Sequence, residues 1–286
     1  MINKPHQCYM RKYIPNSSFY IPFCYFGFVR MGTIAKCFGF ISHFVIPTFY
    51  YFLYLENFLF IPATINYLIS IFLLYNLYEI GYIQNDTESI KKEATPSLRL
   101  YPRNIIFYTK YKVSIYIIRS IYSILFSLLL LFINNFSKGA LLFSGGCYFV
   151  LIIFLLYNEI RSKWSIYIFC ILQISKYLCF TLLFYPNINK IAIYGLILIY
   201  PLPNIIERLS FKRYNIHIFR KLLPDKRSFI KFRAIYYLTI ILVFLFLDYY
   251  NIISFKDYSI FIYLFFFRLL LFFLDMRNVT FKNYLK

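Results

Sequence analysis

The chain has 286 residues, of which 61% are hydrophobic and only 15% are charged. A soluble domain of this length usually has about 45–50% apolar and about 25% charged residues, so the composition excludes an ordinary soluble domain. The formal net charge of +20 would suit a nucleic-acid partner. The charges, however, lie in short islands between apolar runs, a pattern typical of a membrane protein and not of a nucleic-acid-binding surface.

Eight apolar runs are long enough, or nearly so, to cross the hydrocarbon core, which takes about 20 residues in a helix. Backbone polar groups cannot stay unpaired in lipid, so each run is expected to be helical. The sequence therefore predicts an all-α polytopic bundle of about eight transmembrane helices, forming one domain over residues 1–286. The expected spans are residues 37–55, 62–82, 113–133, 140–157, 164–184, 191–206, 234–249 and 258–274.

The distribution of Lys and Arg predicts the orientation. With the N-terminus placed inside, the inward segments hold 25 of these residues and the outward loops hold only Lys138, Lys190 and Lys256. Cytoplasmic loops carry such an excess of positive charge. We therefore expect an integral protein of the bacterial inner membrane, with its N-terminus and main loops in the cytoplasm.

Three of the five inward segments are much longer than the other two. Residues 1–36 form a cytoplasmic or interfacial N-terminal segment, in which the apolar stretch Phe19–Met31 is broken by Pro22. A ninth span by this stretch is the alternative interpretation. The loops 83–112 and 207–233 are much longer than a connection requires, and such loops are often functional.

The inner ends of spans two and six repeat a short polar pattern. Asn76 and Glu79 end the first, and Asn204 and Glu207 end the second. Residues three apart share a helix face. Two pseudo-repeated four-helix halves, each presenting an Asn/Glu pair to one cavity, would produce this pattern, and so would coincidence.

The stretch after span two resembles the first signature of the UbiA-type intramembrane prenyltransferases, Asn-Asp-x-x-Asp-x-x-x-Asp followed by Pro and Arg. Asn85 and Asp86 match its first two positions. Ser89 replaces the middle acid, with Glu88 beside it, and Glu93 takes the place of the last acid. Pro96 and Arg99 follow in the expected order.

Two further stretches resemble the same family at corresponding places in the topology. Tyr157 and Arg161, after span four, resemble its Tyr-x-x-x-Lys/Arg turn. Glu207 lies where the family carries its second acidic signature, although the next acid is only Asp225. The resemblance implies a UbiA-like bundle that holds a polyisoprenoid substrate between its helices.

The resemblance also implies a site. Asp86, Glu93 and Glu207 are its expected catalytic residues and the expected ligands of Mg²⁺, a hard cation that prefers carboxylate oxygens. The expected substrate contacts, which neutralise or position a phosphate or diphosphate, are Asn85, Lys92, Arg99, Tyr157, Arg161, Lys176 and Lys212.

Among the polar residues within the predicted spans, Arg119, Lys176 and His43 carry specific expectations. Arg119 is expected to extend its side chain to the inner surface, as long basic side chains do. Lys176 lies nearer mid-membrane, where an anion contact and a structural pairing are both open. His43 is expected to be a hydrogen-bonded packing residue.

Two classes of function remain. The first is a UbiA-like transferase that moves a polyisoprenoid group, or attaches a sugar phosphate to a polyprenyl phosphate, with a divalent cation. The second is a non-enzymatic polytopic protein, such as a lipid-linked glycan exporter. The expected partners are a polyisoprenoid lipid and membrane lipids, without nucleic acid. The sequence does not decide the oligomeric state.

Overall fold

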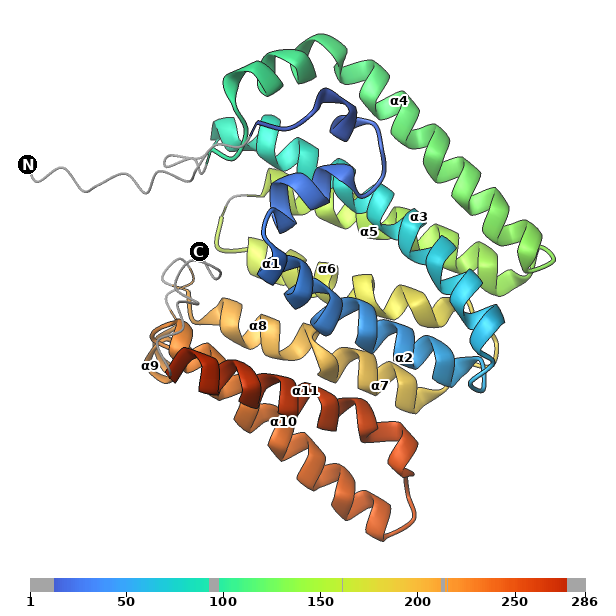
Figure 1. Ribbon diagram of the computed structural model, residues 1–286, viewed down its shortest axis with the longest axis vertical. Helices are drawn as coiled ribbons and strands as arrows, with labels where there is room; N and C mark the ends of the chain where they lie inside the picture. Colours follow the sequence, from blue (N-terminus) through green and yellow to red (C-terminus); the bar gives the residue numbers. More distant parts are fainter. Residues whose placement is uncertain (1–12, 93–97, 161, 212–213, 215, 277–286) are drawn as a thin grey trace, which may run out of the picture.

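The computed structural model describes residues 13–92, 98–160, 162–211, 214 and 216–276. Its regular elements are helices (Figure 1). The longer ones are α1 (Ile34–Phe40), α2 (Ile46–Leu55), α3 (Phe60–Thr87), α4 (Pro102–Ile133), α5 (Lys138–Glu159), α6 (Ser165–Leu182), α7 (Lys190–Ile199), α8 (Pro201–Leu209), α9 (His217–Leu222), α10 (Lys226–Tyr249) and α11 (Phe255–Met276).

Eight of the described helical segments are long and apolar enough to cross a membrane, which confirms the predicted integral membrane architecture. The stretch Phe19–Met31 is not among them. It folds instead into two short helical turns, Asn16–Phe19 and Phe26–Met31. Within the described part of the chain, the prediction of eight spans is therefore correct and the ninth-span alternative is wrong.

The helices pack in an order that separates the two ends of the sequence. α4 packs on α3, α3 on α5 and α5 on α6, while α10 and α11 form a hairpin at the other side of the bundle (Figure 1). α2 contacts both α3 and α7, and α11 contacts α7. We call the end that carries residue 34, residue 87 and residue 165 the basic end, because the Lys- and Arg-rich connections gather there.

The connections at the basic end are shorter than predicted. α3 continues to Thr87 and α4 already begins at Pro102, so much of the expected loop 83–112 is helical. The Thr87 hydroxyl donates to the carbonyl of Ile83 (2.7 Å), and α3 ends there. α3 therefore does not continue past Thr87, and the short helical turn Ser89–Lys92 follows it.

A glycine permits the close packing of α3 on α5. A Cβ atom added to Gly81 would lie only 2.4 Å from the ring of Phe154. The exposed backbone also receives a hydrogen bond, since the Asn158 amide donates to the Gly81 carbonyl (2.8 Å). Small residues commonly allow such an approach of membrane helices.

The sixth span is broken in the middle. α7 ends before Tyr200, whose backbone is not helical (φ −140°), and α8 restarts at Pro201. Proline removes a backbone donor and so leaves carbonyls unpaired. Tyr236 and Tyr237 on α10 donate to the carbonyls of Leu198 (2.8 Å) and Ile199 (2.5 Å). The break is therefore satisfied by side chains from the next span.

A buried ion pair fastens the N-terminal segment, residues 13–33, to the bundle. Arg119 on α4 donates to the Glu79 carboxylate on α3, and both residues are 0% exposed. The same carboxylate accepts the backbone N–H groups of Phe23 (2.9 Å) and Phe26 (2.5 Å). The guanidinium also donates to three carbonyls of this segment, those of Ser18, Phe19 and Ile21.

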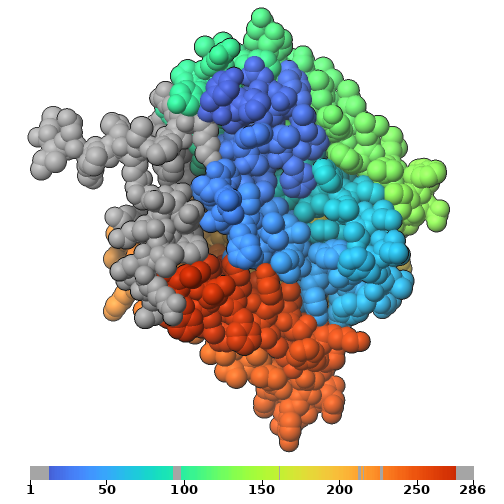
Figure 2. Space-filling view, viewed as in Figure 1, coloured from blue at the N-terminus to red at the C-terminus, as the bar shows by residue number. Residues whose placement is uncertain are grey.

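This arrangement corrects the expectation for Arg119. Its side chain points inward rather than to the surface, because Glu79 and the N-terminal segment offer it acceptors inside the protein. Figure 2 shows the segment, in dark blue, lying against the part of the molecule that contains α4.

We expect Arg119→Met to destabilise the protein by about 3–5 kcal/mol, because Glu79 would remain buried without a partner. Adding Glu79→Gln should restore part of this loss, since a neutral amide still accepts the N–H groups of Phe23 and Phe26. Thermal unfolding in detergent measures both effects. Arg103→Met, on an exposed position of α4, is the matched control. Equal stability of the Arg119→Met and Arg103→Met proteins would contradict this account.

Candidate functional site

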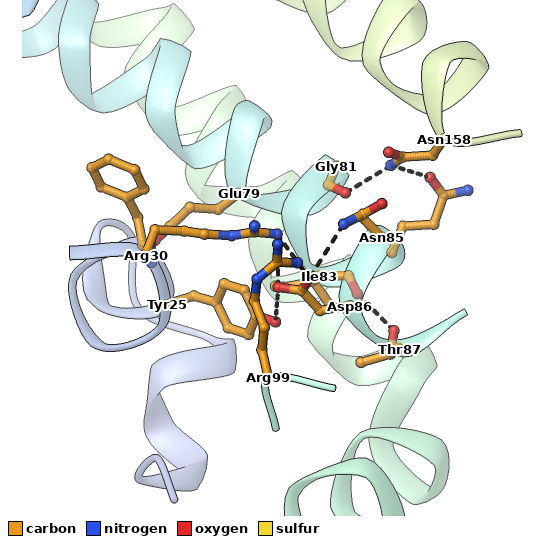
Figure 3. A network of polar contacts seen from close by, with 12 residues as sticks. Tyr25, Arg30, Glu79, Gly81, Ile83, Asn85, Asp86, Thr87, Arg99 and Asn158 are labelled. Carbon is orange, nitrogen blue, oxygen red and sulfur yellow. Dashed lines mark hydrogen bonds and ion pairs between the residues drawn. The ribbon is translucent and has the colours of Figure 1, made fainter. Parts of the chain in front are cut away.

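Asp86 is the centre of a polar cluster at the basic end (Figure 3). Arg30 of the N-terminal segment lies 2.8 Å from both carboxylate oxygens, and Arg99 lies 2.7 Å from Oδ1. The Tyr25 hydroxyl donates to Oδ2 (3.0 Å), and the Asn85 amide donates to Oδ1 (3.2 Å). The Asp86 side chain is fully buried by these partners.

The cluster shifts the pKa values of two of its members, Arg30 and Tyr25. Burial alone would lower the pKa of Arg30, but Asp86 and neighbouring tyrosines outweigh it and raise this pKa above its ordinary value. Burial and then the Asp86 charge raise the pKa of Tyr25 well above its ordinary value. Tyr25 is therefore a neutral donor. The Arg30 guanidinium also lies over the ring of Tyr82, 4.3 Å from its centroid.

A second acid, Glu207 on α8, pairs with Arg233 on α10 through both of its oxygens. Glu79 and Arg119 form the corresponding pair between α3 and α4. Each glutamate of the repeated sequence pattern therefore binds an arginine of the next span. The asparagines differ: Asn76 donates to Arg119 and Ser123, whereas Asn204 donates to Gln173.

The remaining predicted site residues are not gathered in one place. Lys92 pairs with Glu159, and both side chains are about half exposed. The Tyr157 hydroxyl accepts a hydrogen bond from Arg208 (2.7 Å). Glu93, Arg161 and Lys212 lie outside the described residues.

The described carboxylates do not fit a magnesium site in this arrangement. The oxygens of Asp86 and Glu207 face guanidinium groups, which cannot coordinate a cation. Within the described residues there is also no group of three or more His, Cys, Asp and Glu residues that could hold a metal ion. The prediction of Mg²⁺ now depends on Glu93, which lies outside the described residues.

A cavity of about 650 Å³ lies between α1, α3, α6, α8, α10 and α11. Its walls are rich in Phe, Tyr and Leu side chains. Four cations contribute to its lining, against one acid, Glu207. These cations are Lys36, Lys176, Arg233 and Arg268. Asp86 does not line the cavity, but Tyr82, which contacts Arg30, does.

Lys176 lies deep in this cavity, about 16 Å along α6 from the basic end at the usual helical rise. Its ammonium group donates to the Tyr75 hydroxyl (2.9 Å). It also lies over the rings of Phe44, Tyr75 and Tyr78, 4.3–4.7 Å from their centroids. Aromatic faces attract cations. The sequence left a structural pairing and an anion contact open for Lys176. In the structure Lys176 is held by neighbouring side chains and also lines a cavity, so both interpretations remain compatible with its position.

Sequence reasoning did not include Lys36, Arg233, Arg268 and His43 in the site. Arg233 and Arg268 lie toward the basic end of the last hairpin, on α10 and α11 respectively, and their only sequence signal was their position in or beside an apolar run. His43 was expected to be a packing residue. His43 had a further sequence signal. It lies four residues before Pro47 in the same span, and a proline inside a helix removes the backbone hydrogen bond to the residue four positions earlier.

Comparisons with models of protein families, with curated proteins and with solved structures gave no match to this chain.

We expect Asp86→Asn to loosen the N-terminal segment, because the amide loses the charge that binds Arg30 and Arg99. Charge-assisted hydrogen bonds contribute about 1.5–3 kcal/mol each, so amide hydrogen exchange in residues 26–31 should accelerate roughly tenfold or more. Glu88→Gln is the control, since Glu88 binds Tyr108 and Lys112 of α4 instead. Unchanged exchange in the Asp86→Asn protein would show that the cluster does not hold the segment.

Proposed function

We propose that this chain is a membrane-embedded transferase of the UbiA type. It either transfers a polyisoprenoid group or attaches a sugar phosphate to a polyprenyl phosphate. The observation that carries this proposal is the cavity, which combines an aromatic and aliphatic wall with an excess of cations. A ligand that fits both properties has a long apolar part and an anionic head.

The volume and the lining of the cavity support a lipid substrate. Ligand cavities of about 300–1,000 Å³ are typical of small-molecule sites, and the present one falls within that range. Its lining residues come from the first, second, fifth, sixth, seventh and eighth spans. An isoprenoid tail between these helices would contact Phe38, Phe40 and Leu271 among others. A phosphate or diphosphate head would contact the cations.

In this proposal the acids act mainly on the arginines. Asp86 fixes Arg30 and Arg99, and Glu207 fixes Arg233 at the cavity wall. A guanidinium held in one orientation stabilises the charge that develops on a departing phosphate without reorganising during the reaction. The requirement for Mg²⁺ rests on the resemblance in sequence and is tested below by chelation.

A water-soluble, anionic co-substrate suits the basic end. The Asp86 cluster, Lys92 and Arg208 lie there, and so does Lys36, one of the cations that line the cavity. A donor that arrives from the aqueous side would meet these groups first. We therefore favour a sugar phosphate donor from the aqueous side, with the polyprenyl phosphate supplied from the bilayer.

The proposal predicts transferase activity in membranes that contain the chain. Membranes should convert a labelled sugar diphosphate donor and a polyprenyl phosphate, or a polyprenyl diphosphate and an aromatic acceptor, to a labelled lipid product. Asp86→Asn should lower the rate roughly 100-fold, as expected when a fixed electrostatic contact is lost. Chelation with EDTA tests the separate expectation of Mg²⁺ that the resemblance implies: activity that is lost and then restored by Mg²⁺ would support it, and unchanged activity would contradict it.

Asp248→Asn is the matched control, because Asp248 lies at the opposite end of α10 and accepts a hydrogen bond from Tyr258 (2.9 Å). It should leave the rate unchanged. Full activity of the Asp86→Asn protein would refute the assigned role of Asp86. If membranes gave no product with either substrate pair and instead moved a lipid-linked glycan between leaflets, the exporter interpretation would replace the transferase.

A further inference from the structure

One buried cation in the cavity wall has no hydrogen-bond or ion-pair partner among the residues that the structure describes. Arg268 on α11 is only 8% exposed. It makes no hydrogen bond or ion pair with any residue that the structure describes, and its buried Nε atom is unsatisfied. Its guanidinium lies 6.0 Å from the centroid of the Phe267 ring, and Arg233 and Glu207 are near enough to act on it electrostatically without a hydrogen bond.

An unpaired buried guanidinium is costly, and such groups normally bind an anion. Glu207, the acid on the cavity wall, binds Arg233 through both of its oxygens and makes no hydrogen bond to Arg268 in the described structure. Lys176, the other deep cation, already donates to Tyr75. Arg268 is therefore the cation of the cavity that has the greatest need of an anionic ligand.

His43, which lines the same cavity, is the second residue with an unused polar atom. Its Nδ1 lies 2.7 Å from the carbonyl of Gly39. A carbonyl only accepts, so Nδ1 carries the hydrogen, and Nε2 of the neutral ring is an acceptor. This Nε2 has no hydrogen-bond partner in the described structure.

The backbone around His43 also departs from a regular helix. His43 lies in the π-helical turn Ile41–Val45, which joins α1 to α2. Such turns occur often at functional sites. The ring of Phe267, the residue before Arg268, packs edge-on against the imidazole with centroids 4.8 Å apart. The first and eighth spans thus bring an unused acceptor and an unpaired cation to one part of the cavity.

We propose that Arg268 and His43 form a recognition site for a phosphate monoester, the head of a polyprenyl monophosphate. The guanidinium binds the negative charge of the phosphate, and His43 Nε2 accepts the hydrogen of its P–OH group. A phosphate diester has no such hydrogen, and a polyprenol has no charge. This inference rests on the proposed function, because it names the lipid head that the cavity selects.

The test is the affinity of the purified full-length chain, in detergent, for a polyprenyl monophosphate. Arg268→Gln should weaken binding about tenfold or more, the loss expected for a charge-assisted hydrogen bond. Arg268→Lys keeps the charge and should lie between the two. Arg103→Gln, the same change at an exposed arginine of α4, should bind as the unchanged protein does.

His43→Phe keeps an aromatic ring but removes the acceptor. It should reduce the preference for the monophosphate over a phosphatidylglycerol diester, which the unchanged protein should bind weakly. Inorganic phosphate alone should also bind weakly, since it lacks the tail that contacts the aromatic wall. Equal affinity for inorganic phosphate would overturn the assignment to a lipid head.

The outcomes separate this inference from the proposed function. If the unchanged protein binds the monophosphate and folded Arg268→Gln protein binds it equally well, the site is elsewhere and only this inference fails. Thermal unfolding without lipid establishes that each variant is folded. If the unchanged protein binds neither polyprenyl monophosphate nor polyprenyl diphosphate, the substrate class of the proposed function fails as well.

Discussion

A charge buried among apolar helices has to be neutralised close by, and this constraint organises the basic end of the molecule. Glu79 meets Arg119 inside the bundle, Asp86 meets two arginines, and Glu207 meets Arg233. The first pair also supplies donors and acceptors to the backbone of residues 18–26, which lie in and between two short helical turns. Hydrogen bonds between this ion pair and the backbone of the N-terminal segment therefore satisfy both the buried charges and the backbone groups, and they hold the segment in place.

The cavity departs from this rule, and its departure is the basis of the functional account. Its wall carries more cations than acids, and Arg268 makes no ion pair among the described residues. An excess of cations over acids has no use in a purely structural core, whereas a site for an anionic lipid requires it. The break at Tyr200 and the π-helical turn at His43 border the same space, so the irregular backbone of two spans lies where a ligand would be bound.

The spans could be predicted from sequence because each is a local run of apolar residues with charges at its ends. The partners of the charges could not. Asp86 and Arg30 are 56 residues apart, and Arg119 and Glu79 are 40 apart, so nothing local relates them. Arg119 accordingly looked like a surface-seeking side chain, and Asp86 like a free metal ligand. Lys176 was recognised by its depth alone, but the three aromatic rings around it come from α3 and from the turn Ile41–Val45, which are far from α6 in the sequence.

The central claim is that the cavity holds an anionic polyisoprenoid lipid. A polyprenyl phosphate with a photoreactive group in its tail tests it most directly, by crosslinking in membranes followed by peptide mapping. The account predicts labelled peptides from the cavity-lining parts of α1, α6 and α11, and their protection by unlabelled polyprenyl phosphate. Label confined to the lipid-facing surfaces of α4 and α5, without such protection, would contradict it.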